Sequence, residues 1–273
     1  MLRTMDNRTA PAPSPPDVAA DRPRARRDGT PRIERLCHVT GALLIASGLL
    51  HLVVLAVDGG PWEGPVSWRK PITFGVSFGL TLLAVAWISS YVRMGARLRA
   101  VLLGVFAADC VLEVAGITVQ AWRGVPSHFN METPFDTAVS MTLAVGGAVL
   151  VGVLSTLTAA VFARRPDGPP GMALALRAGC AILGVGLLSG AAMIARGVYL
   201  TRTGHQLAGY ASTAPLKPLH GVSLHAVLVL PVLARALALT SWSPRVRLRM
   251  VRAAVGGYAL AVAGALVWAA ATY

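Results

Sequence analysis

The sequence predicts an all-α protein, an integral membrane helix bundle of about seven transmembrane helices with a cytoplasmic N-terminus and an outside C-terminus. Two observations carry this prediction: the overall apolar composition, and seven apolar runs separated by polar gaps. The 273 residues are 55% hydrophobic and only 14% charged, with a mean hydropathy of +0.61. Ordinary soluble domains carry about 25% charged residues. The composition therefore excludes an ordinary soluble domain and indicates a membrane protein.

Each apolar run is close to the roughly 20 residues that a helix needs to cross the hydrocarbon core of a bilayer. The predicted spans are residues 37–57, 72–92, 98–120, 137–163, 172–194, 219–239 and 251–272. Basic clusters fall in alternate gaps, and the positive-inside rule places these gaps in the cytoplasm. The seventh span carries almost no polar side chain, so we expect it at the periphery of the bundle.

Residues 1–35 form a basic segment rich in Pro and Arg, with almost no large apolar side chains. Such a composition predicts a disordered cytoplasmic tail, followed by a transmembrane domain over residues 36–273. The formal charge of +13 resides mainly in this tail and in the gaps between spans. We therefore expect the lipid bilayer as partner and no nucleic acid, with a bacterial plasma membrane as the location.

The third span carries an acidic stripe. At 100° per residue, Asp109, Glu113 and Gln120 lie within about 40° of one another on the predicted helix. Acidic side chains within a membrane are expensive and mark functional sites, and a polar face belongs in a bundle interior or a watery cavity. Glu113 and Asp109 are therefore the candidate catalytic or proton-binding acids.

Two histidines fall at the predicted depth of Glu113. Counted inward from the outer end of each span at about 1.5 Å per residue, His51, Glu113 and His225 all lie roughly 10 Å deep. Two imidazoles and a carboxylate predict a site for zinc, iron or another transition metal. As an alternative, His51 and His225 are candidate axial ligands of a haem.

The expected rim of this outward-facing pocket is formed by basic and polar residues near the ends of the spans. These rim residues are Arg69, Lys70, Gln120, Arg123, His128 and His220. Arg69 and Lys70 lie on the side where positive charge is disfavoured. They are expected to pair with Glu113 or Asp136, or to bind an anionic headgroup or a carboxylate substrate.

Two short patterns concern packing and repetition. Gly75 and Gly79, and likewise Gly186 and Gly190, have the small-x3-small spacing that allows helices to approach closely. The tripeptide Arg-Gly-Val occurs at residues 123–125 and again at 196–198, which is a hint of internal duplication.

Two stretches resemble segments of uncharacterised bacterial multi-pass membrane proteins. They are W-x5-W-R-K-P at residues 62–71 and R-G-V-x-S-H-F-N at residues 123–130. The resemblance implies a multi-pass helical protein and brings no activity.

A looser likeness is to the seven-span metal-dependent amide hydrolases that include the alkaline ceramidases. Those proteins have a Ser-x3-His pair on one helix, an acid on another and a late His-x3-His pair. Ser47 with His51, and Asp109 or Glu113, match the first two features. The late histidine pair departs from the pattern, because four residues separate its members.

Three functions of different classes are therefore open, and whether the protein is an enzyme is open with them. The first is a metal- or haem-binding membrane protein that performs redox chemistry or hydrolyses a lipid-type substrate. The second is a small-solute or proton-coupled transporter in which Glu113 and Asp109 titrate. The third is a non-enzymatic component of a membrane complex.

Overall fold

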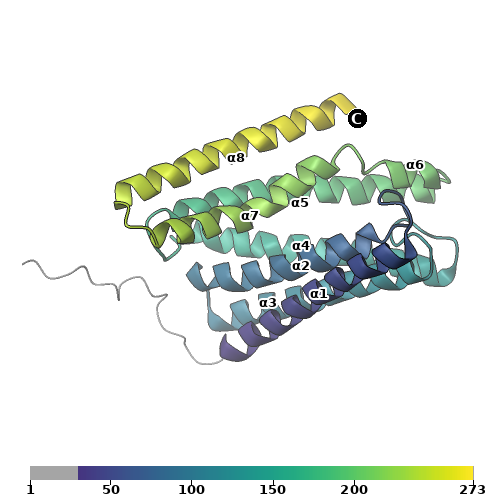
Figure 1. Ribbon diagram of the computed structural model, residues 1–273, viewed down its shortest axis with the longest axis horizontal. Helices are drawn as coiled ribbons and strands as arrows, with labels where there is room; N and C mark the ends of the chain where they lie inside the picture. The colour runs from purple at the N-terminus through teal and green to yellow at the C-terminus, as the bar shows by residue number, and fades with distance from the viewer. Residues whose placement is uncertain (1–29, 273) are drawn as a thin grey trace, which may run out of the picture.

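The computed structural model describes residues 30–272, which form seven long helices and two short ones (Figure 1). The long helices are α1 (Thr30–Asp58), α2 (Arg69–Ile88), α3 (Ala96–Trp122), α4 (Pro134–Ala163), α5 (Met172–Arg202), α7 (Lys217–Ala238) and α8 (Pro244–Thr272). The short ones are the 3-10 helix η2 (Ser89–Tyr91) and α6 (Gln206–Ala211). All seven long helices are long and apolar enough to cross a membrane, so the predicted multi-pass bundle is confirmed.

Most of the predicted tail, residues 1–29, lies outside the described residues. Helix α1 begins at Thr30, earlier than the predicted start of the first span at residue 37. We refer to the two ends of the bundle by one residue each. The His128 end contains the loops of residues 59–68, 123–133 and 203–216, and the Arg93 end contains those of residues 92–95, 164–171 and 239–243.

The long helices form two three-helix units joined by a single helix. In the first unit, α1, α2 and α3 contact one another, and in the second unit α5, α7 and α8 do the same. Helix α4 packs on α3 and on α5, and the principal direct contact between the units joins their middle helices, α2 and α7 (Figure 1). Both units begin at the Arg93 end, so they run in the same direction through the bundle.

The sequences of the two units repeat in the same order. Each helix of the first unit shares a short pattern with its counterpart in the second. The matched segments are G-x6-G-L-L at 41–50 and 179–188, K-P-x3-G-V-S at 70–77 with K-P-x2-G-V-S at 217–223, and R-L-R-x-V at 97–101 and 247–251. The two units therefore repeat one another in helix order, in pairwise packing and in these short patterns. The Arg-Gly-Val tripeptides are no part of this repeat, because the first follows α3 and the second lies within α5.

Glycines bring the first two helices of the first unit into backbone contact. A Cβ atom on Gly79 would lie 2.5 Å from the carbonyl oxygen of Gly41, and one on Gly75 would lie 2.8 Å from the Cα of Gly48. In the second unit, a Cβ atom on Gly186 would lie 3.1 Å from the backbone nitrogen of Leu224. The close approach predicted from the small-x3-small spacing is confirmed.

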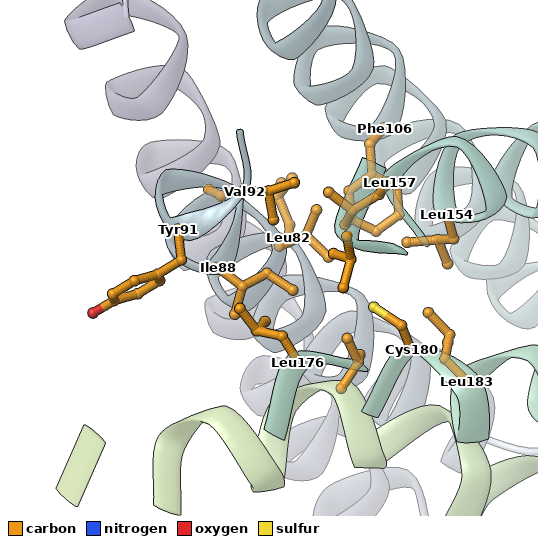
Figure 2. Close-up of a cluster of buried hydrophobic side chains, with 14 of the residues drawn as sticks. Leu82, Ile88, Tyr91, Val92, Phe106, Leu154, Leu157, Leu176, Cys180 and Leu183 are labelled. Carbon is orange, nitrogen blue, oxygen red and sulfur yellow. The ribbon is translucent and has the colours of Figure 1, made fainter. Parts of the chain in front are cut away.

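A buried apolar core joins the two units and α4 toward the Arg93 end. It contains Leu82 and Ile88 of α2, Phe106 of α3, Leu157 of α4 and Leu176 of α5, all nearly inaccessible to solvent (Figure 2). Helix α8 contributes little to it and lies at one side of the bundle (Figure 1). The predicted peripheral position of the seventh span is confirmed.

Candidate functional site

The two acids of α3 lie together near the middle of the bundle. Asp109 is thirteen residues from each end of α3, which corresponds to about 20 Å from each end at about 1.5 Å per residue. The residues Asp109 and Glu113 are 5% and 3% exposed. Both face α4, because a Cβ atom on Gly146 would lie 2.9 Å from Asp109 Oδ1 and 2.5 Å from Glu113 Oε1.

These two carboxyl groups lack the partners that usually accompany buried acids. Within residues 30–272, neither group forms an ion pair or accepts a hydrogen bond, and Asp109 Oδ2 is a fully buried oxygen without a partner. An unpaired buried acid is expensive, so a pair of them one helical turn apart calls for a bound proton or cation. We refer to Asp109 and Glu113 as the acid pair.

The acid pair has no counterpart in the second unit. Counted from the R-L-R-x-V match, the corresponding residues of α8 are Ala259 and Ala263. Of the two units, only the first therefore supplies acids to the bundle interior.

The remainder of the predicted stripe also faces α4. A Cβ atom on Gly116 would lie 3.0 Å from Leu143, and the Gln120 side chain donates a 2.8 Å hydrogen bond to Asp136 of α4. Asp109, Glu113 and Gln120 thus line one interior face, as the helical spacing predicts.

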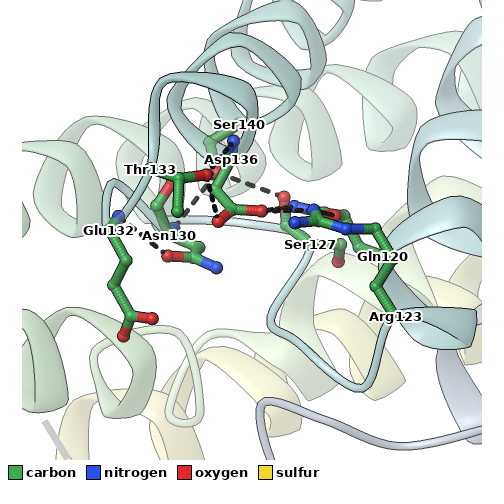
Figure 3. Close-up of polar contacts among 8 residues, drawn as sticks. All are labelled: Gln120, Arg123, Ser127, Asn130, Glu132, Thr133, Asp136 and Ser140. Atoms are coloured by element: carbon green, nitrogen blue, oxygen red, sulfur yellow. Dashed lines mark hydrogen bonds and ion pairs between the residues drawn. The ribbon is translucent and has the colours of Figure 1, made fainter.

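Asp136 is the centre of a polar network where α3 ends and α4 begins (Figure 3). Its carboxylate is 3% exposed and accepts hydrogen bonds from Arg123 Nη1 at 2.5 Å and Thr133 Oγ1 at 2.6 Å, besides that from Gln120. Arg123 also donates to the side-chain oxygen of Gln120. Asp136 therefore pairs with Arg123, and not with Arg69 or Lys70 as one prediction had it.

The loop of residues 123–133 folds inward at the His128 end. The Ser140 hydroxyl of α4 donates to the Asn130 carbonyl oxygen at 2.9 Å, and Glu132 N donates to Asn130 Oδ1 at 3.1 Å (Figure 3). The Asn130 side-chain nitrogen is buried and has no partner among the described residues. The loop is thus fixed to α4 while one of its amide donors stays unused.

The same loop bridges the two units. Phe129 has a left-handed backbone with φ of 61°, which is rare for a bulky residue. Its ring packs on Gly197 of α5, leaving no room there for a Cβ atom. The neighbouring His128 ring lies 5.9 Å from the Phe74 ring of α2. Burial, together with the charge of nearby Lys70, lowers the pKa of His128 to about 3, so the ring is neutral at ordinary pH.

His51 occupies an aromatic site and not the acid pair. Its Nδ1 lies 2.7 Å from the Ser47 carbonyl oxygen, and its Nε2 lies 3.1 Å from Trp122 Nε1. The Trp68 ring is also adjacent, with a centroid distance of 6.0 Å. Because both ring nitrogens have partners, a metal would bind His51 only after one of these hydrogen bonds was broken.

The structure does not bring together the residues predicted to hold a metal or a haem. Trp122, the partner of His51, follows Glu113 by nine positions, a rise of about 14 Å along α3. His225 lies in the other unit on α7, with an exposed side chain. Among residues 30–272, no group of three or more His, Cys, Asp or Glu side chains is placed to hold a metal ion. His51 therefore lies near the end of α3 and not at the level of Glu113, because the ends of α1 and α3 are not level with each other.

The remaining rim residues lie in two places, Arg69 and Lys70 beside the loop of residues 59–68 and His220 between α5 and α7. Arg69, the first residue of α2, pairs with Glu63 of the preceding loop at 3.2 Å. The Lys70 ammonium group donates to the Pro65 carbonyl oxygen at 2.7 Å. His220 is wedged between α5 and α7, with its Nδ1 at 2.8 Å from the Gly186 carbonyl oxygen. None of the three contacts the acid pair.

Comparison of the chain with profiles of protein families, with curated proteins and with solved structures gives no match. The two resemblances drawn from short sequence stretches therefore remain predictions. The residues of the chain itself therefore carry the conclusion. The chain is a multi-pass helical membrane protein built from two parallel three-helix units, with a buried acid pair at mid-bundle.

Proposed function

We propose that the protein is a proton-coupled carrier of a small solute, and that the acid pair carries the proton. The observation behind this proposal is that Asp109 and Glu113 are buried one turn apart at mid-bundle without an ion pair in the described chain. Ionisable residues within membrane spans mark ion pathways and proton relays in pumps and transporters. A carboxyl pair that gains and loses one proton provides such a relay.

The duplicated architecture supports this proposal. Many carriers are built from repeated units, including parallel repeats related by an axis along the membrane normal, and bind their cargo near the midplane. Here the units meet through α4 and through the contact between α2 and α7. Rocking of one unit against the other would change access to the acid pair from the two sides of the membrane.

The loop of residues 123–133 is suited to closing the His128 end in this mechanism. It is fixed to α4 through Ser140, reaches α5 through Phe129 and reaches α2 through His128. Movement of the units would therefore strain or release this loop. The basic clusters at the Arg93 end favour a cytoplasmic position for that end, with the His128 end outside.

The metal or haem function receives less support from the geometry. His51 already has two hydrogen-bond partners, and His225 is exposed on the other unit. The acid pair, in contrast, can bind a proton without the loss of an existing hydrogen bond. This difference is our reason for placing the carrier first.

The test is solute-driven proton movement in liposomes. The purified chain is reconstituted with a pH-sensitive dye inside, and organic acids, phosphate, amino acids and sugars are added outside in turn. We expect one solute class to change the internal pH, and we expect Glu113→Gln to abolish that change. Glu132→Gln, at an exposed loop position, is the matched control and should behave as wild type. A solute that moves protons equally well through Glu113→Gln would contradict the proposal.

A further inference from the structure

The chain has a marked preference for arginine over lysine, with two exceptions. Of its 25 basic residues, only Lys70 and Lys217 are lysines. Each is followed by proline, and each lies at the start of the middle helix of its unit. The two lysines thus stand at the same place in the two units, directly before proline at the start of the middle helix.

The fold places both lysines at the same end of the bundle. Helices α2 and α7 both begin at the His128 end, and they form the principal direct contact between the units. Lys217 is close enough to act electrostatically on Lys70. The ring of His128 lies on Phe74, one helical turn from Lys70, so the loop histidine borders the same place.

Neither lysine is neutralised by an acid within residues 30–272. Lys70 donates to a carbonyl oxygen, and Lys217 is exposed and forms no ion pair. The acids of this end are engaged elsewhere or exposed. Asp58 accepts from Trp68, Glu63 pairs with Arg69, Asp136 pairs with Arg123, and Glu132 is exposed near Tyr210.

Two further charges favour an anion at this place. The N-termini of α2 and α7 carry the positive ends of their helix dipoles. The guanidinium group of Arg69 adds to the positive potential around Lys70. An ammonium group is a compact charge with three rotatable donors, which suits a small oxyanion approached from two sides.

We propose that Lys70 and Lys217 form an oxyanion-binding site at the His128 end, where the two units meet. Its ligand is a carboxylate or phosphate group, held between one lysine of each unit. The group belongs either to a free solute or to a lipid headgroup. Binding requires no transport, so this site stands or falls separately from the proposed carrier activity.

The test measures binding of inorganic phosphate to the full chain in a neutral detergent. We expect phosphate to raise the thermal unfolding temperature, and chloride at equal ionic strength to leave it unchanged. Lys70→Gln and Lys217→Gln should each weaken the apparent affinity at least tenfold. The Lys217 side chain is exposed, so its variant should fold as wild type. Arg202→Gln removes an exposed cation of the same end as a matched control and should bind phosphate normally.

A second arm of the experiment identifies the source of the oxyanion. The same variants are placed in nanodiscs of phosphatidylcholine with or without phosphatidylglycerol. Phosphate binding in detergent assigns the site to a free solute. Stabilisation by phosphatidylglycerol alone, lost in both lysine variants, assigns it to a headgroup. The proposal is overturned if neither ligand stabilises the wild type, or if the lysine variants respond as strongly as wild type.

Discussion

Glu113 on α3 directs its carboxyl group at the backbone of Gly146 on α4, where a Cβ atom would lie 2.5 Å from Oε1. The same missing side chain makes room for Asp109, whose Oδ1 would lie 2.9 Å from that Cβ atom. Because Gly146 of α4 has no side chain, two acids of α3 fit into the same buried position.

Gly146→Ala should impair the site more than the fold. The added methyl group must displace at least one carboxyl group, and overpacking of this kind costs about 1–3 kcal/mol. We expect a lower thermal unfolding temperature in detergent and a loss of solute-driven proton movement. Gly152→Ala, on the same helix, is the control because nothing lies within 4 Å of its Cβ position. Equal effects of the two substitutions would show that Gly146 has no special role.

Gly197→Ala should loosen the loop of residues 123–133. A Cβ atom on Gly197 would collide with the ring of Phe129, so the loop must shift away from α5, at a cost of about 1–3 kcal/mol. The double variant with Phe129→Ala should recover part of that cost, because the colliding ring is gone. Stability is measured by chemical unfolding in detergent. Gly184→Ala, at an open position of α5, is the control and should leave the stability unchanged. If the changes in unfolding free energy from Gly197→Ala and Phe129→Ala simply add in the double variant, the predicted contact is contradicted.

Asp136→Ala should be strongly destabilising, since it removes the common acceptor for Gln120, Arg123 and Thr133. Loss of a buried, hydrogen-bonded partner costs about 1–3 kcal/mol. Asp136→Asn keeps an acceptor oxygen and should recover part of the loss. The measurement is the unfolding temperature, with Glu132→Ala as the control at an exposed neighbouring position. An Asp136→Ala variant as stable as Glu132→Ala would show that the network contributes nothing.

His128 should make the protein less stable in acid. Its pKa is about 3 in the folded chain and 6.5 as the ordinary value, so the unfolded chain binds a proton more readily. Its contribution to stability is therefore complete above about pH 6.5 and is lost as the pH falls from there toward 3. His128→Gln should flatten this part of the dependence of unfolding temperature on pH. His205→Gln, at an exposed position of the same end, should not change it.

The fold could be predicted from the sequence because a bilayer imposes simple rules. Span length and hydropathy identify all seven long helices, and the polar spacing of α3 predicts that Asp109, Glu113 and Gln120 share an interior face. The short helix α6 is not predictable in this way, because six residues in a loop carry no usable period. The start of α1 at Thr30 is not predictable from hydropathy either, because a helix can extend past the apolar run into polar residues.

The ligand set was harder to predict, because a residue count along each span gives a common depth only where the helix ends are level with each other. His51 and Glu113 count to the same depth, yet His51 turns to Trp122 and Glu113 turns to Gly146. A second case is the lysine pair of the proposed oxyanion site, in which each lysine is followed by proline. It becomes meaningful only when α2 and α7 are recognised as matching helices, which requires the contacts between helices as well as the sequence.

Helix α4 explains how two copies of one unit come to point the same way. A chain that crosses a membrane three times finishes on the opposite side, so a directly fused second copy would be inserted upside down. One intervening crossing returns the chain to its starting side before the second copy begins. A protein lacking α4 would therefore be expected to insert its final three helices in the inverted orientation, with Lys217 carried to the face opposite Lys70.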